Sequence, residues 1–168
     1  MRNMDIELIE IIKNAVDANV KHIQAHLCRI NSNDHSNIKN FQKGVLKCLK
    51  SHPKWQWEKE QPIREGSKVS VDILGDLNGK KCIIEIDTVR HDQISSKFVS
   101  RIALSDFKEP IDYVAILYDS TQKSGPQRAK TYIIYMRKIM RQINRKSSIM
   151  GVYIHVDKNT GTHNIDIW

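Results

Sequence analysis

Two acidic residues close an apolar segment that otherwise has the composition of a buried strand. The segment KKCIIEID, residues 80–87, places Glu85 and Asp87 two positions apart. Side chains two apart on a strand share a face, so both carboxylates are expected to lie together beside Ile83. Burying unpaired charge is costly or shifts the pKa of the group. The pair therefore needs water, a basic partner or a cation.

Further acids come from the two preceding predicted strands, residues 54–63 and 68–75. Asp72 is expected near the middle of the second one, which the turn signal DLNG joins to the antiparallel strand 80–87. Glu58 or Glu60 comes from the first. Clustered carboxylates favour a hard cation such as Mg²⁺, for which Mn²⁺ can substitute, with phosphate oxygens completing the shell. Such an ion promotes hydrolysis of a phosphodiester. Solvated charges on an open sheet face are the alternative interpretation.

A predicted helix over residues 90–107 adds basic and amide groups. Its polar stripe borders an apolar ridge and consists of Arg90, Gln93, Lys97 and Arg101. A stripe beside a buried ridge lies at the helix edge, close to the sheet. We expect Arg90, Gln93 and Arg101 to bind phosphate or DNA, with Gln93 and Lys97 reaching the same phosphate as the acids. A solvated position also suits Arg101.

The periodicity of the remaining chain supplies the elements that would position these residues. Spacings of three and four from Met4 to Ile30 predict one long helix, and a second helix ends before Pro53. Three strands form an antiparallel meander, and the strand at 111–120, a helix from Gly125 and the strand at 149–156 form a β-α-β unit. A short strand ends the chain. The sequence predicts one α/β domain, with a mixed sheet flanked by helices in residues 35–168 and a helical extension in residues 1–34.

This arrangement resembles the PD-(D/E)XK, or restriction-endonuclease-like, nuclease superfamily. The resemblance covers roughly Ile38 to Val156 and depends on Asp72, the run Glu85-Ile86-Asp87 and the following helix. It implies a restriction-endonuclease-like core and a Mg²⁺-dependent endonuclease that cuts DNA, in the manner of type II restriction enzymes.

The resemblance also implies a set of metal ligands. In that family the acid of the second strand and the first acid of the third hold the ion, which corresponds to Asp72 and Glu85. The main-chain carbonyl of Ile86 would be a further ligand. An upstream acid often joins the site, and Glu60 or Glu58 would fill that position.

One position departs from the family pattern, because Asp87 stands where the family usually has lysine. Some members use a second acid here as a ligand or to orient water, and others bring the lysine from the next helix, where Lys97 stands. The departure leaves open which group is the general base. The alternative function is a catalytically inactive module that binds nucleic acid or a protein partner.

Composition favours a polyanionic partner. The chain has 27 Lys and Arg against 19 Asp and Glu, a net charge of +8 and a pI near 9.4. No acid interrupts residues 123–146, where phosphate contacts are expected from Lys130, Arg137, Arg141 and Arg145. DNA is the predicted partner, while a membrane surface ranks last because no segment combines basic and aromatic residues in an amphipathic pattern.

Compartment and assembly follow from weaker signals. Three widely spaced cysteines favour reduced thiols, and no apolar segment matches a signal peptide or a membrane span, so we expect a cytoplasmic protein. Cutting both DNA strands requires two sites. A homodimer is therefore expected, formed through the apolar face of the first long helix.

Overall fold

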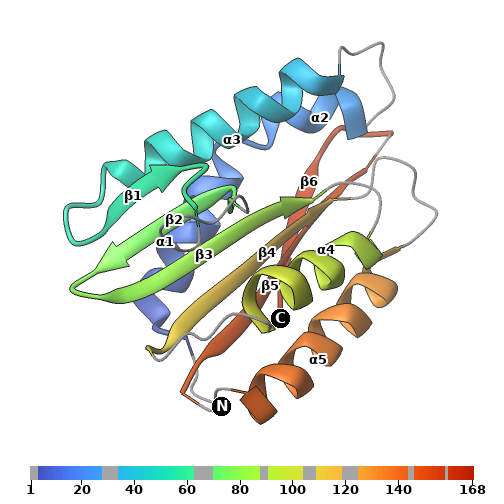
Figure 1. Cartoon of the computed structure of the whole chain (residues 1–168). Helices are drawn as coiled ribbons and strands as arrows, with labels where there is room; N and C mark the ends of the chain where they lie inside the picture. The colour runs from blue at the N-terminus through green and yellow to red at the C-terminus, as the bar shows by residue number, and fades with distance from the viewer. Residues whose placement is uncertain are drawn as a thin grey trace.

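The central strand of the fold is apolar on both faces, which requires helices on both sides of the sheet. In β4, Ile111–Tyr118, all eight side chains are buried. The computed structural model describes residues 4–27, 34–62, 70–87, 91–103, 109–118, 125–143, 146–157 and 159–168. Within these residues, six strands form one sheet in the order β1 to β6, with helices on its two faces (Figure 1).

The strand pairings produce a mixed sheet. The strands are β1 Gln56–Lys59, β2 Ile73–Leu77, β3 Lys80–Asp87, β4, β5 Ser148–Val156 and β6 His163–Ile167. The first three pair antiparallel, β4 and β5 add in parallel, and β6 returns antiparallel. The predicted α/β class, with a meander followed by a β-α-β unit, is confirmed.

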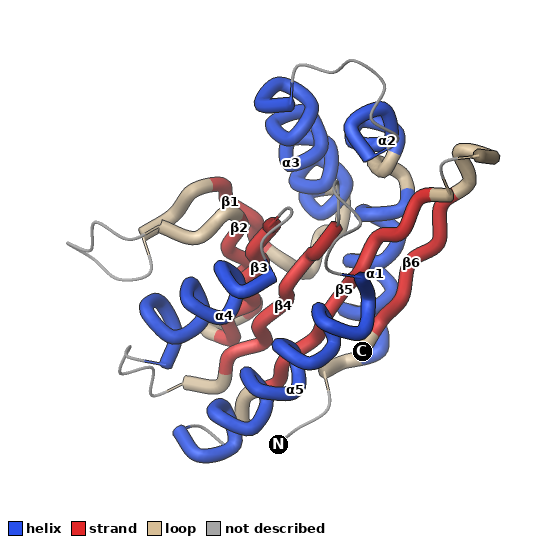
Figure 2. Tube along the Cα trace, turned by 90° about the vertical axis from the view of Figure 1, so that its right-hand side faces the viewer, coloured by secondary structure: helices blue, strands red, loops and turns tan. Residues whose placement is uncertain are grey.

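The helices divide into two layers. They are α1 Ile6–Asp17, α2 Lys21–Leu27, α3 Asp34–Lys50, α4 His91–Phe98, the π-helical turn η1 Val99–Ala103 and α5 Gly125–Ile143. Residues of α1, α2 and α3 share a core with Ile84, whereas residues of α4, η1 and α5 share another with Ile83. Because adjacent side chains of β3 point to opposite faces, the two layers lie on opposite sides of the sheet (Figure 2). Within the described residues, no helix is long and apolar enough to cross a membrane.

The prediction of one long first helix was wrong, because the chain breaks between α1 and α2 at Asn19. The side-chain amide of Asn19 donates to the Ala15 carbonyl at 2.7 Å, the acceptor that its own backbone N–H would use in an α-helix. That N–H donates to Val16 instead, so the helix tightens and stops.

The apolar face of these two helices is covered by the protein itself. Its side chains are almost completely buried in the core beneath the sheet: Leu8, Ile12, Val16, Val20 and Ile23. The surface on which the predicted homodimer depended is therefore not exposed.

The second strand and the fourth helix also differ from the prediction. Asp72 does not lie within β2 but directly before it, at a bend. Val71 and Ile73, which regular alternation would place on one face, consequently belong to opposite cores. The predicted helix 90–107 is described from His91 to Ala103, and its last five described residues form the π-helical turn.

Candidate functional site

Two carboxylates end β3 on the face covered by α4 and η1. Glu85 and Asp87 follow Ile83 at intervals of two, and their side chains are 0% and 7% exposed. In β4, Ala115 pairs with Glu85, so a small side chain stands beside the buried carboxylate. Because side chains alternate along β3, both carboxylates lie between the sheet and the helices α4 and η1.

Asp72 joins these acids because of the bend before β2. Backbone pairing between β2 and β3 ends at Ile73 opposite Ile84. Beyond that point the Asp72 Oδ2 atom accepts a hydrogen bond from the Ile86 N–H at 2.8 Å. The Asp72 side chain therefore accepts the hydrogen bond that a backbone carbonyl of β2 would accept if the strand pairing continued.

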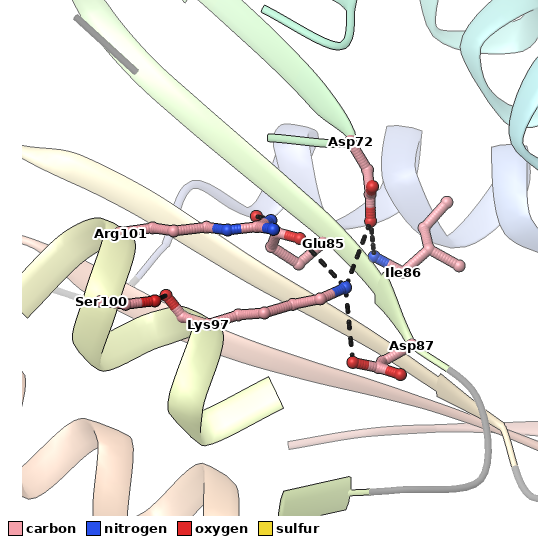
Figure 3. A network of polar contacts seen from close by, with 7 residues as sticks. All are labelled: Asp72, Glu85, Ile86, Asp87, Lys97, Ser100 and Arg101. Carbon is pink, nitrogen blue, oxygen red and sulfur yellow. Dashed lines mark hydrogen bonds and ion pairs between the residues drawn. The ribbon is translucent and has the colours of Figure 1, made fainter. Parts of the chain in front are cut away.

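The ammonium of Lys97 lies among the three acids (Figure 3). Its Nζ atom is 3.4 Å from Asp87 Oδ2, 3.5 Å from Glu85 Oε2 and 3.9 Å from Asp72 Oδ2. Lys97 extends from α4 across the gap to the sheet, with 26% of its side chain exposed. The predicted approach of Lys97 to the acids is thus present in the structure.

Arg101 supplies a second cation one turn further along. Its Nη1 atom is 2.6 Å from Glu85 Oε1, and its side chain is mostly buried. Sequence periodicity allowed a solvated position for Arg101 and a role in binding phosphate, but did not indicate this ion pair. The available signal was its spacing of four from Lys97, which places both cations on one side of the helix.

The pKa of Glu85 is raised by its surroundings. Burial and the neighbouring Asp72 carboxylate raise the pKa of Glu85 from 4.5 to about 7, although Arg101 and Lys97 act in the opposite direction. Its Oε2 atom is buried and accepts no hydrogen bond from the described residues. The hydroxyl of Tyr113 is also buried, and it has no hydrogen-bond partner among the described residues. Sequence reasoning missed Tyr113, which lies within an apolar strand.

The upstream acids lie elsewhere. Glu58 is exposed on β1, opposite Leu74. Glu60 is exposed too, and its carboxylate pairs with Lys59 at 2.6 Å. The acids that the structure brings together are therefore Asp72, Glu85 and Asp87.

The predicted phosphate-binding residues are distributed over two helices. Gln93 is exposed on α4, one turn before Lys97. On α5, Lys130 and Arg141 are exposed. Arg137 instead donates from Nε and Nη2 to the Ile149 carbonyl, both at 3.0 Å, which fastens α5 to β5. Arg90 and Arg145 lie outside the described residues.

The three carboxylates have the right chemistry for a hard cation, but Lys97 and Arg101 already compensate two of their three negative charges. Carboxylate oxygens are the ligands that Mg²⁺ prefers, and the buried Glu85 Oε2 atom has unused acceptor capacity. However, the described residues contain no group of three or more acidic, histidine or cysteine side chains able to hold a metal ion. An ion here would use fewer carboxylates, supplemented by main-chain oxygen and water.

Comparisons with known proteins give a structural similarity. The chain is similar to the structure of Pyrococcus furiosus SfsA in complex with Ca²⁺, with a TM-score of 0.37 and 8% sequence identity. The match covers 79% of this chain and 60% of that chain. No protein-family model matches the sequence, and no curated protein matches it either.

Proposed function

We propose that the chain is a metal-dependent nuclease that hydrolyses phosphodiester bonds of DNA. The observation that carries this proposal is the position of the Lys97 ammonium, within 3.9 Å of Asp72, Glu85 and Asp87. Nucleases of the restriction-like superfamily usually carry this lysine on the strand. Here the helix would supply the same charge to the same acids.

Asp72 and Glu85 would hold Mg²⁺, together with the Ile86 carbonyl. In a strand, the N–H and C=O of one residue point to the same edge. Because the Ile86 N–H meets Asp72, its carbonyl faces the edge on which Asp72 lies. When bound, the ion lowers the pKa of a water and neutralises charge on the phosphate.

Lys97 would exchange partners during the reaction. Its flexible side chain now contacts carboxylates; once Asp72 and Glu85 held an ion, a phosphate between α4 and β3 would be the anion left for the ammonium to bind. Gln93, exposed one turn earlier, could donate its amide to the same phosphate. Asp87 would then be released from the ammonium to orient the attacking water.

Arg101 would act on Glu85 rather than on substrate. Its guanidinium is 2.6 Å from Glu85 Oε1, which fixes the carboxylate and leaves Oε2 directed to the site. In this assignment Arg101 is a positioning residue.

Plasmid cleavage tests the proposal. Wild-type protein with Mg²⁺ or Mn²⁺ is expected to nick or linearise supercoiled DNA, whereas Asp72→Asn, Glu85→Gln and Lys97→Gln lose activity by at least about a hundredfold. Asp76→Asn is the matched control, because Asp76 also belongs to the β2–β3 hairpin but pairs with Lys81. Equal loss in the control, or cleavage that survives Glu85→Gln, would refute the assignment.

A second candidate is a DNA-binding module without chemistry. The specific observation in its favour is that Lys97 and Arg101 already compensate two of the three negative charges, so the acids have counter-ions without a bound metal. Asp87 in place of lysine agrees with this alternative. DNA binding without cleavage under any divalent ion would select it.

A further inference from the structure

The outward face of α5 exposes large apolar side chains that the core does not need. Ile134 is 41% exposed and Tyr135 52%, and Ile143, the last residue of the helix, is 47% exposed. The opposite side of the helix supplies the buried contacts to the sheet, through Ala129, Ile133, Met136 and Met140. A cluster of exposed apolar side chains on one helix indicates an interaction surface.

The same face is strongly basic. From Gly125 to Ile143 the helix contains no acidic residue, and its exposed cations are Arg128, Lys130, Lys138 and Arg141. Charge complementarity therefore selects an anionic partner and disfavours a second copy of this helix.

Cations and aromatic rings alternate along the outer row of α5. Arg128, Tyr135 and Lys138 are spaced seven and three apart, so they project from one side of the helix over about 15 Å. The Lys138 Nζ atom lies 6.0 Å from the centroid of the Tyr135 ring. Tyr132 packs edge-on against Tyr135, with centroids 6.4 Å apart, and so restricts the ring.

We infer that this face binds a single-stranded segment of DNA, with a base stacked on Tyr135 and phosphates held by Arg128 and Lys138. A groove of basic residues with exposed aromatic rings is the pattern by which proteins bind unpaired strands. A duplex hides its base faces, so an exposed tyrosine would gain little from it. The inference rests on the proposed function for the choice of DNA and adds the form that the DNA takes.

The location suits a strand that continues toward the acids. In both views α5 lies beside α4, the helix that carries Lys97 (Figures 1 and 2), and residues of both helices share one core. DNA on α5 would therefore lie next to the helix that carries Lys97.

Fluorescence anisotropy of a labelled oligothymidylate, in EDTA and at low salt, tests the inference. Wild type is expected to bind the single strand at least tenfold more tightly than a labelled mixed-sequence hairpin duplex. Tyr135→Ala should weaken single-strand binding about tenfold, while Tyr135→Phe retains it. Lys138→Gln should reduce the slope of log affinity against log salt by about 0.7. Ile6→Ala, at an exposed apolar position on α1, is the control and should change nothing.

Each contrary result has a definite meaning. Preference for the duplex, or unchanged affinity in Tyr135→Ala, overturns the inference. A wild-type dimer in sedimentation that Tyr135→Ala dissociates shows that a second copy is the occupant, which also overturns it. The measurement needs no cleavage, so single-strand binding without plasmid nicking refutes the proposed chemistry alone. Plasmid nicking that is metal-dependent, with no single-strand preference, refutes this inference alone.

Discussion

Glu85 is a buried carboxylate whose ionisation opposes folding. In the unfolded chain its pKa returns to the ordinary value of 4.5, whereas in the folded protein burial and Asp72 raise that pKa to about 7. The folded state therefore binds more protons than the unfolded state between these pH values. Its contribution to stability is greatest below pH 4.5, falls as the pH rises and is lowest above pH 7, a change of about 3 kcal/mol. A charge retained at this cost is typical of a functional site.

Glu85→Gln is expected to flatten this pH dependence. The amide keeps an oxygen for Arg101 but cannot ionise, so the variant should be at least as stable as wild type at pH 8. Urea denaturation at pH 5 and pH 8 gives the free energy of unfolding for both proteins. Glu58→Gln, an exposed position on β1, is the matched control. An unchanged difference between the two pH values would contradict the account of Glu85.

Lys97→Met is expected to destabilise the protein at pH 8 by about 1–3 kcal/mol. The loss falls below that for a fully buried pair, because Lys97 is partly exposed. At pH 5 the loss should be smaller, since Glu85 is then protonated. Added Mg²⁺ should raise the melting temperature of Lys97→Met more than that of wild type, because the acids have lost their ammonium. Lys97→Arg keeps the charge and serves as the control; equal responses of all three proteins to Mg²⁺ would contradict the prediction.

At the scale of elements, close contacts between side chains and backbone fix the start of the sheet. Gly75 in β2 lies under the Trp57 ring, and an added Cβ would come within 2.4 Å of Cζ3. Trp57 in turn stacks on Trp55, with centroids 5.3 Å apart. The β1–β2 pairing therefore requires a glycine for steric reasons rather than for a special backbone angle.

Gly75→Ala is expected to cost about 1–3 kcal/mol, because the tryptophan must move. Tryptophan fluorescence during urea denaturation reports both the stability and the environment of the rings. Gly79→Ala is not a suitable control, since Gly79 has a positive φ. Ile134→Ala on α5 is exposed and should leave the transition unchanged. A Gly75→Ala protein with wild-type stability and spectrum would refute the steric argument.

The sequence predicted the elements well where periodicity is uniform. Alternation and continuous apolar runs predicted the succession of strands along the chain and the α/β class, because a strand buried on one or two faces has a clear pattern. Irregular points depend on individual contacts, and periodicity does not encode these. The Asn19 side chain displaces a backbone hydrogen bond, and Asp72 replaces a strand as the partner of Ile86.

In the candidate site, too, regular geometry could be predicted from the sequence and individual contacts could not. That Asp72, Glu85, Asp87 and Lys97 meet could be predicted from spacing, since strand and helix geometry bring them to one end of β3. The buried pair of Arg101 with Glu85 could not, because a long polar side chain at a helix edge can turn to solvent or to the sheet. The direction of the Arg101 side chain depends on how deeply Glu85 is buried, and this burial is set by the tertiary structure.

At the scale of the whole molecule, the two helical layers have different roles. The layer of α1, α2 and α3 buries its apolar face against the sheet, and side chains fasten it to the far strands: His163 Nε2 lies 2.7 Å from Asp17 Oδ1. The layer of α4, η1 and α5 carries the lysine at the acids and the exposed basic face. With a net charge of +8, this arrangement confines the proposed DNA contacts to one side of the sheet.

The Lys97 ammonium among the acids also determines whether the chain can fold when a chelator removes divalent ions. Lys97 is a counter-ion tethered by its own backbone, so folding need not wait for one to arrive from solution. Denatured wild-type protein should therefore refold from urea in excess chelator to a state with a cooperative thermal unfolding transition, which a thermal scan in chelator detects. A protein stabilised by a structural ion behaves in the opposite way, because removing the ion unfolds it.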